Sequence, residues 1–279
     1  MKKLGLIAFV LLVQTSFAQV NRFVYQVTMK PNASDKNDIK TENAYLDISP
    51  EKSVFYSENR IKRDSVMQAT FQSGGARSFN REQMQSLRSN INYSIEKDKK
   101  SQKMTFKDRI GRDVYTYEED RPLNWKILSE TTKIGDYKVQ KAETDFGGRK
   151  WTAWFTTDLP YQDGPYKFGG LPGLIVKAED DKGDYSFDLM KNYKIEDFPA
   201  MNQFGNTIKV KRGDYVKQQK KFQEDPMSFM TQGGGQIRIG GGEGGPRGGG
   251  GTPPADFRKR MEERVKDEAK KNSNPIELQ

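Results

Sequence analysis

Apolar and polar side chains alternate with a period of two over much of this sequence. The stretch RFVYQVTMK (22–30) places Phe23, Tyr25 and Val27 on one side of an extended chain, and NAYLDIS (43–49) repeats the pattern. Successive side chains of a strand point to opposite faces, so a period of two predicts strands that are buried on one face. We therefore expect this part of the chain to fold as β-structure.

Turn-forming residues separate the alternating segments at short intervals. The triplet Ser-Pro-Glu at 49–51 joins the second segment to KSVFYSE (52–58), which predicts a hairpin. Three further segments at short spacing, residues 92–98, 102–110 and 112–120, predict an antiparallel meander. The polar residues 63–89 predict only a short helix or a loop around REQMQSLRS, and no part of the core.

The alternation continues through residues 123–160 and again after residue 173, with a hairpin tip expected at Asp181-Lys182-Gly183-Asp184. We predict a mainly β fold built on an antiparallel curved sheet, in the form of a bowl, a partial barrel or a sandwich. A short helix is expected near the C-terminus, because Phe257, Met261 and Val265 recur every four residues among charged side chains.

Composition changes divide the chain into four predicted parts. Residues 1–18 carry two lysines, an apolar run and the small-residue pattern Ser16-Phe17-Ala18, which is the layout of a secretory signal peptide. Residues 19–230 form the β-rich domain, residues 231–254 are a glycine-rich segment expected to be disordered, and residues 255–279 are a helix and tail. We therefore expect an exported protein, periplasmic, outer-membrane associated or secreted, with no transmembrane segment after signal cleavage.

The absence of cysteine and histidine removes several functional classes. It excludes disulfides, a cysteine nucleophile, a Ser-His-Asp triad and the usual zinc sites. We predict no metal and no cofactor. The formal net charge is +9, but the basic residues are interspersed with acidic ones along the sequence. This pattern favours a solvated surface, and no nucleic-acid partner is expected.

The segment Trp125 to Ile175 resembles the signature region of the GLPGLI family of exported bacteroidete proteins. The resemblance rests on Trp125, Gln140-Lys141-Ala142, Gly148-Arg149, Trp151, Trp154, Gly164-Pro165 and Gly170-Leu171-Pro172-Gly173-Leu174-Ile175, together with the closing NPIEL at 274–278. The family is defined by this signature and implies no established activity. A further resemblance, to the β-rich N-terminal module of secreted peptide:N-glycanases, implies a bowl-like β domain without glycanase chemistry.

The glycines of the signature favour a structural turn over a phosphate-binding loop. A phosphate-binding loop needs a lysine and a hydroxyl residue after its last glycine and a helix that begins there, whereas Leu174 and Ile175 follow Gly173. We expect Pro172 and Gly173 to form a type II turn that leads into a buried strand, with positive φ at Gly173. Gly170, Pro172 and Gly173 are thus predicted to shape a backbone turn and not to bind a ligand.

The stretch GGRKWTAWF (147–155) is the strongest candidate for a binding surface. In a strand, Arg149 and Trp151 share one face while Trp154 lies on the other. One interpretation is that both tryptophans simply pack, and the other is that a tryptophan beside a cation forms a surface for sugars, peptides or carboxylates. The residues predicted near such a site are Gln140, Lys141, Arg149, Trp151, Trp154, Tyr161 and Tyr166.

Carboxylate clusters at 118–120 and 180–184 lie at predicted turns, and we expect them to be solvated hairpin tips. Ser65 lies in Asp64-Ser65-Val66, which resembles the O-glycosylation pattern of exported bacteroidete proteins. We expect a non-enzymatic binding or accessory module of the cell envelope, with an envelope or outer-membrane protein as partner or a glycan or peptide as ligand. The alternatives are a carboxylate-based hydrolase acting on glycans or peptides and a purely structural envelope component.

Overall fold

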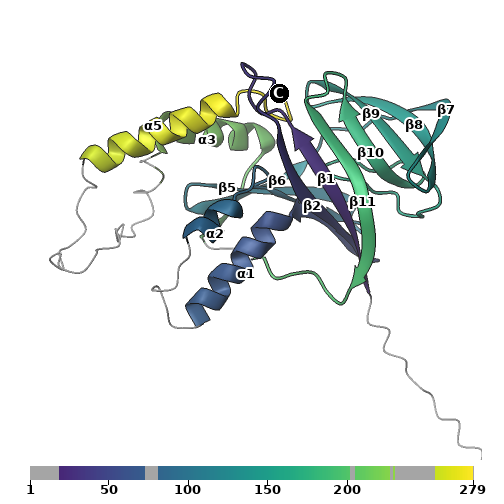
Figure 1. Cartoon of the computed structure of the whole chain (residues 1–279), viewed down its shortest axis with the longest axis horizontal. Helices are drawn as coiled ribbons and strands as arrows, with labels where there is room; N and C mark the ends of the chain where they lie inside the picture. The colour runs from purple at the N-terminus through teal and green to yellow at the C-terminus, as the bar shows by residue number, and fades with distance from the viewer. Residues whose placement is uncertain (1–18, 73–80, 202–204, 227–228, 230–254, 279) are drawn as a thin grey trace, which may run out of the picture.

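The computed structural model describes residues 19–72, 81–201, 205–226, 229 and 255–278, and within these ranges it confirms the mainly β fold (Figure 1). Twelve strands in the described residues form one curved, open sheet in the order β12-β6-β5-β4-β3-β2-β1-β11-β10-β9-β8-β7. Neighbouring strands run antiparallel, apart from β12 and β6, which are parallel. The strands are β1 Val20–Met29, β2 Lys40–Ile48, β3 Lys52–Ser57, β4 Ser94–Asp98, β5 Lys103–Ile110, β6 Asp113–Glu119, β7 Lys126–Ile134, β8 Tyr137–Phe146, β9 Arg149–Thr156, β10 Leu174–Asp180, β11 Tyr185–Ile195 and β12 Thr207–Lys209.

Helices lie on both faces of the sheet: α3 packs on β5 and β6, and α1 packs on β2 and β3 from the other face. In Figure 1, α3 and α5 lie above β5 and β6, and α1 and α2 lie below them. The C-terminal helix expected from sequence is α5, and its Val265 is buried. The helices are α1 Glu58–Gln72, α2 Arg81–Ser86, α3 Arg212–Glu224 and α5 Ala255–Lys271.

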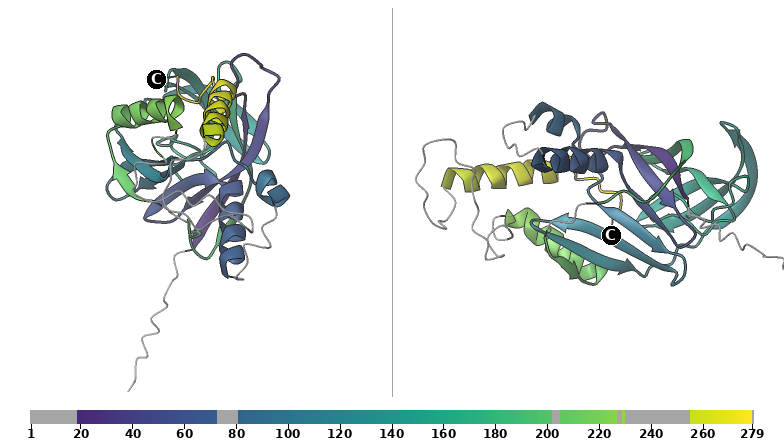
Figure 2. Two further views of the ribbon diagram at one scale, coloured as in Figure 1. Left: turned by 90° about the vertical axis from the view of Figure 1, so that its left-hand side faces the viewer. Right: turned by 90° about the horizontal axis from the view of Figure 1, so that it is seen from below.

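The main hydrophobic core fills the concave side of the sheet. The right-hand view of Figure 2 shows β7 to β10 curling at one end of the molecule and α3 and α5 at the other. Aromatic side chains form much of this core: Tyr166 stacks on Phe187 with ring centroids 6.2 Å apart, and Phe168 lies 4.7 Å from Trp151. The rings come from β9, β11 and the segment between β9 and β10, so the core joins segments that are separate in sequence.

The opposite face carries a smaller cluster and the largest difference from the sequence expectation. Helix α1 occupies residues for which we expected only a short helix or a loop outside the core. Its Ile61 packs on a cluster that includes Val24, Tyr45 and Tyr56. Beneath it, Arg22 binds the fully buried Asp47 through two hydrogen bonds of 2.7 Å. Few apolar residues mark this helix in the sequence, and only Asp64 of its described side chains is buried.

Most local expectations hold. The hairpin between β2 and β3, the β4–β5–β6 meander and the tip at Asp181–Asp184 between β10 and β11 are all present. The short helix expected near REQMQSLRS is α2. The predicted signal peptide (1–18) and glycine-rich segment (231–254) lie outside the described residues.

Candidate functional site

The loop between β9 and β10, residues 157–173, folds into the concave side of the sheet. Lys167, Phe168 and Leu171 are each no more than 1 % exposed. Gly164 is needed here because a Cβ would lie 2.8 Å from Cδ1 of Ile175. The signature of the sequence therefore forms part of the interior of the bowl.

The expected type II turn at Pro172-Gly173 is wrong in its detail. The glycine with positive φ is Gly170 (φ +81°), and Gly173 is not in the left-handed region. A Cβ on Gly173 would lie 2.0 Å from the carbonyl oxygen of Thr156, so glycine is required there because two backbones approach closely. The strand expected after this turn is present as β10.

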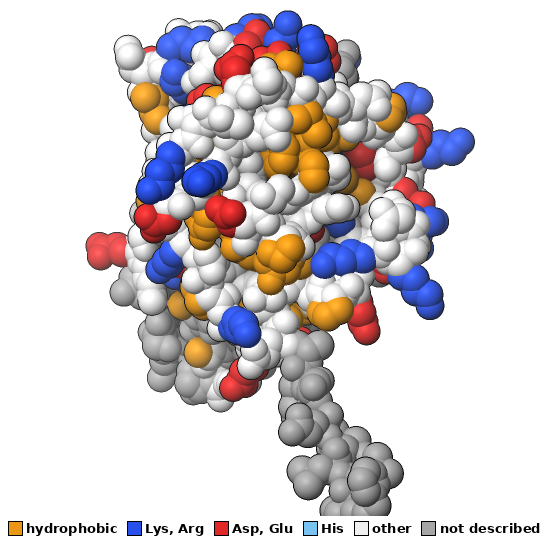
Figure 3. Space-filling view, turned by 90° about the vertical axis from the view of Figure 1, so that its right-hand side faces the viewer, with side chains coloured by type: hydrophobic (Ala, Val, Ile, Leu, Met, Phe, Trp, Pro, Cys, Tyr) orange, Lys and Arg blue, Asp and Glu red, His pale blue; other side chains and the backbone are white. Residues whose placement is uncertain are grey.

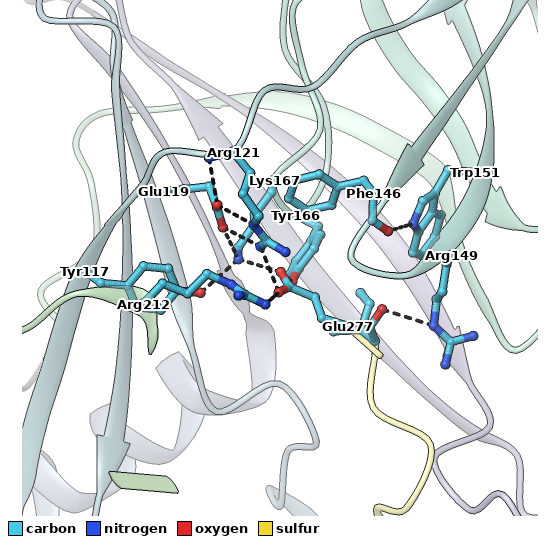
Figure 4. Close-up of polar contacts among 11 residues, drawn as sticks. Tyr117, Glu119, Arg121, Phe146, Arg149, Trp151, Tyr166, Lys167, Arg212 and Glu277 are labelled. Carbon is cyan, nitrogen blue, oxygen red and sulfur yellow. Dashed lines mark hydrogen bonds and ion pairs between the residues drawn. The ribbon is translucent and has the colours of Figure 1, made fainter. Parts of the chain in front are cut away.

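Lys167 is the centre of a buried polar cluster, shown in Figure 4. Its ammonium donates to the Tyr117 hydroxyl (2.9 Å), to Oε2 of Glu119 (2.6 Å) and to Oε1 of Glu277 (2.5 Å). The three donors of the ammonium thus have three acceptors. Four aromatic rings lie within 6 Å of the same nitrogen, those of Phe106, Tyr117, Phe146 and Tyr166.

Glu277 comes from the end of the chain and lies far in sequence from most of its partners. We call residues 272–278 the tail. The Glu277 carboxylate accepts hydrogen bonds from Tyr166 Oη (2.5 Å), Arg121 (2.8 Å) and Arg212 (3.2 Å) as well as from Lys167. The start of helix α3, the segment after strand β6 and the 157–173 loop therefore meet at one side chain of the tail.

Arg149 holds the other end of the tail and is 3 % exposed. Its guanidinium donates to the carbonyl oxygens of Pro275 (2.7 Å) and Ile276 (3.0 Å) and to Oδ1 of Asn274 (2.6 Å). Its positive charge is balanced by Asp180 at 2.5 Å and by Asp184 at 3.4 Å. One buried guanidinium thus binds both the tail backbone and two carboxylates.

The Gly147-Gly148 turn between β8 and β9 leaves room for the tail. Both glycines have positive φ, +62° and +78°. A Cβ on Gly147 would lie 2.9 Å from Cγ of Glu277, and one on Gly148 would lie 3.0 Å from Cβ of Leu278. The Leu278 N–H donates to the Gly147 carbonyl at 2.6 Å. These glycines therefore serve both the turn and the contact with the tail.

The electrostatics of this cluster keep its carboxylates ionised. Burial alone would raise the pKa of Glu277, but the charge and hydrogen bond of Lys167, with the Tyr166 hydroxyl and Arg121, lower it to about 2. For Glu119, burial is likewise outweighed by Arg121 and Lys167, which lower the pKa. Burial and the neighbouring Glu277 raise the pKa of Tyr166 well above its ordinary value.

An open depression of about 940 Å³ adjoins this cluster, between β5, β6, β12 and the start of α3. Arg121 and Arg212 line it and also bind Glu277 from the inner side. Five of its lining residues are cationic and three are acidic. The cationic residues are Lys107, Arg121, Lys209, Lys211 and Arg212, and the acidic ones are Glu118, Asp120 and Asp214.

The structure separates the site residues expected from sequence. Arg149 and Trp151 share the buried face, as the period of two predicts, and the Trp151 indole donates to the Phe146 carbonyl at 3.1 Å. Tyr166 joins the Lys167 cluster through Glu277. All three residues are buried, and Arg149 and Tyr166 contact the tail directly.

The remaining expected residues lie elsewhere. Trp154 is half-buried on the opposite face of β9, in register between Lys141 and Lys177. Lys141 lies 3.1 Å from Glu143, and Gln140 donates to the Leu128 carbonyl at 2.7 Å. Tyr161 packs edge-on against Phe23 at 5.2 Å. The sequence pattern thus identified part of the tail site but grouped it with residues of other surfaces.

The expectation that both carboxylate clusters are solvated hairpin tips is wrong for three side chains. Glu119, Asp180 and Asp184 are each no more than 3 % exposed in their side chains. Each is paired with a buried cation, which offsets the cost of burying its charge. Within the described ranges, no three acidic side chains gather in a way that could hold a metal ion.

Two features on other surfaces complete the comparison with the sequence. Ser65 is exposed on α1, and its O-glycosylation stays a prediction.

Figure 3 looks onto the end of the molecule formed by β7 to β11, where apolar side chains lie among charged ones. The large exposed ones on these strands are Ile127, Met190 and Tyr193. Lysines and a register shift between Ile127 and Thr131 make the β7 edge a poor template for further strands.

Residues 147–177 match the model of a family described as "Protein of unknown function (Porph_ging)". This segment contains Gly147, Gly148, Arg149, Tyr166 and Lys167, all of which contact the tail. No significant match occurs among curated proteins. Among the described residues, none of the helices is long and apolar enough to cross a membrane.

Solved structures similar to this chain include two of PNGF-II, in the P21 and C2 space groups. Their TM-scores are 0.53 and 0.52 at 18 % identity, and the aligned region covers 73 % of this chain. It spans only 34 % and 33 % of the PNGF-II chains. The expected likeness to a peptide:N-glycanase-related protein is therefore confirmed at the level of the fold. This chain resembles a family of unknown function over residues 147–177 and PNGF-II over 73 % of its length.

Proposed function

We propose that this protein is an exported, non-enzymatic binding module of the GLPGLI type, and that its ligand is an acidic glycan bound in the open depression beside α3. The observation that carries the proposal is the excess of cations there. Lys209 and Lys211 make no ion pair within the described residues. Two lysines without counter-ions in a concave surface attract an anionic ligand.

Two of the three acidic residues of the depression are paired with lysines outside it, which leaves one carboxylate, Asp120, against Lys209 and Lys211. Glu118 is 2.9 Å from Lys103, and Asp214 is 3.3 Å from Lys217, two lysines that do not line the depression. Arg121 and Arg212 already neutralise Glu277, yet each keeps about a quarter of its side chain exposed. The depression is therefore positively charged toward solvent.

A glycan fits this lining better than a flat anionic surface would. Hydroxyl residues Thr105 and Thr207 lie among the cations. Hydroxyl groups and cations together match the hydroxyls and carboxylates of an acidic sugar chain. The pattern of residues 1–18 supports export, and the proposed setting is the periplasm, the outer membrane or the exterior.

The geometry supports binding better than hydrolysis. Glycoside hydrolysis needs one carboxylic acid with a raised pKa near a second carboxylate. Glu119 and Glu277 both contact Lys167, and the pKa of each is lowered. They are thus suited to hold a cation and the tail, and unsuited to protonate a leaving group.

The test is binding of the mature chain to an array that contains uronic-acid glycans, neutral glycans and acidic peptides. We expect binding to the uronic-acid glycans that weakens with added salt. The double variant Lys209→Ala/Lys211→Ala should bind about tenfold more weakly, roughly 1.4 kcal/mol. The control variant Lys133→Ala/Lys182→Ala changes two exposed lysines remote from the depression and should bind normally.

Each other outcome rejects the proposal in a different way. Binding to acidic peptides alone would replace the glycan by a peptide ligand. Binding that the Lys209→Ala/Lys211→Ala variant retains would place the ligand elsewhere. No binding by the folded chain would favour a purely structural envelope component.

A further inference from the structure

Some contacts bind side chains of the tail, and others bind its backbone. Arg149 donates to the side-chain oxygen of Asn274, and Lys167 donates to the carboxylate of Glu277. The Tyr185 hydroxyl donates to the Asn274 carbonyl at 2.6 Å, and the Asn274 amide donates to the Lys30 carbonyl at 2.8 Å. Both polar side chains of the segment Asn-Pro-Ile-Glu are therefore recognised individually.

Apolar contact adds to this recognition. Ile276 lies between the two polar side chains and packs against the main core cluster. Pro275 is exposed, and only its carbonyl is held, by Arg149. Residues 275–278 lie outside helix and strand, so a free peptide of the same sequence needs no secondary structure to make the same contacts.

The two cations that hold the tail also have partners outside it. Arg149 is fixed by Asp180 at 2.5 Å, and Asp180 accepts the backbone N–H groups of Asp184 and Tyr185. At the other end, Lys167 is fixed by Tyr117 and Glu119, and Arg121 binds Glu119 through two hydrogen bonds of 2.7 Å.

Every one of these anchors lies in the body of the protein. A site that keeps its shape when empty avoids the cost of ordering on binding.

We propose that the signature segment forms a peptide-recognition site for the sequence Asn-Pro-Ile-Glu, occupied here by the tail, and that it accepts a peptide of this chemistry from another polypeptide. This site goes beyond the glycan-binding depression, because Lys209 and Lys211 do not contact the tail. In the intact chain the tail competes with any such peptide. A tethered ligand has an effective concentration of about 1 mM, so a free peptide with a Kd of about 10 µM binds about a hundredfold more weakly until the tail is displaced.

The first experiment uses the full chain with Glu277→Lys, which places an ammonium beside Lys167, Arg121 and Arg212 and expels the tail. A fluorescent peptide with the sequence of residues 271–279, KNSNPIELQ, is titrated by fluorescence anisotropy. We expect it to bind this variant about a hundredfold more tightly than it binds the unchanged chain. The same peptide with lysine in place of its glutamate should not bind.

A second variant of the full chain keeps every residue of the site, in case Glu277→Lys does not fold. A specific protease site inserted after Lys271 allows the tail to be cut from the folded chain. After cleavage, the fluorescent peptide should exchange into the site, and the Lys209→Ala/Lys211→Ala change should leave that exchange unaltered. Near-ultraviolet circular dichroism confirms the fold in each case.

The proposal is overturned if the peptide binds neither folded protein. It is equally overturned if the charge-reversed peptide binds as well as the original, because recognition of Glu277 would then be absent. Loss of exchange in the lysine double variant would show that the peptide occupies the depression instead. Failure of the glycan array with successful peptide exchange rejects only the glycan proposal.

Discussion

Arg149 and Lys167 are two buried cations on one signature segment, and they hold the same tail in different ways. Arg149 binds two backbone carbonyls and one side-chain amide, whereas Lys167 binds the Glu277 carboxylate. A guanidinium presents several donors in a fixed plane and suits many acceptors at once. An ammonium is a compact point charge and suits one cluster of anions.

The difference shows how a single segment can supply both position and selectivity. The Arg149 end fixes where the backbone of the tail lies, and it accepts any residue at 275 and 276 as far as its hydrogen bonds are concerned. The Lys167 end requires a carboxylate at 277. The two ends also differ in redundancy, because Glu277 keeps Arg121 and Arg212 as partners when Lys167 is removed.

The largest effect is expected from Arg149→Met. This change removes the partner of several buried acceptors, including the fully buried Asp180, and we expect a loss of about 4 kcal/mol in the free energy of unfolding. Chemical denaturation measures it. Lys150→Met, on the exposed opposite face of the same strand, is the matched control and should behave like the unchanged protein.

Lys167→Met should cost less, about 3 kcal/mol, because Arg121 and Arg212 still neutralise the two carboxylates. The double variant Lys167→Met/Glu277→Gln should lose less than the sum of the two single changes, since the uncompensated charge is removed. A larger loss for Lys167→Met than for Arg149→Met would reverse the proposed difference between the two ends.

Acid should weaken the Lys167 end selectively. The pKa of Glu277 is about 2 in the folded chain against 4.5 ordinarily. The unfolded chain therefore binds the proton first, so the stabilisation is complete above about pH 4.5 and is lost as the pH falls toward 2. The difference between these two pKa values corresponds to about 3 kcal/mol.

Denaturation between about pH 6 and about pH 3 should show a steeper loss of stability for the unchanged chain than for Glu277→Gln, because only the unchanged chain carries the titrating carboxyl. Equal slopes would show that Glu277 does not contribute to the acid sensitivity.

The smallest effect is expected at the glycine turn that faces the tail. Gly148→Ala and Gly135→Ala both place a side chain at positive φ, at +78° and +56°, and each should cost about 1 kcal/mol. The Gly148 change alone also meets Leu278, at 3.0 Å, whereas nothing lies within 4 Å at Gly135. Denaturation should show the greater loss for Gly148→Ala, and equal losses would indicate that the tail does not press on this turn.

Local patterns in the sequence were enough to predict much of the fold. The period of two located the strands and placed Arg149 and Trp151 on one face, and the Asp181–Asp184 turn was found from its composition. The same patterns missed α1, whose residues carry little apolar periodicity. They also gave the wrong reason for Gly173, because its constraint is a backbone from another segment.

The site was only partly visible in the sequence. Arg149, Trp151 and Tyr166 were predicted near a site, but Lys167, Glu119 and Glu277 were not. Two signals pointed to the missing residues: Lys167 lies between Tyr166 and Phe168 within the signature region 125–175, and NPIEL at 274–278 was part of the resemblance. Neither signal indicated that the two segments meet.

The sequence by itself determined the class of fold, the strand pairs joined by short turns and the faces of individual strands. These depend on the period of side chains and on turn chemistry, which act over a few residues. Only the tertiary structure decided which charges are buried and which cation each carboxylate meets. Lys167 and Glu277 are 110 residues apart in sequence. A contact over that separation depends on how the whole sheet curves and on where the tail packs against it.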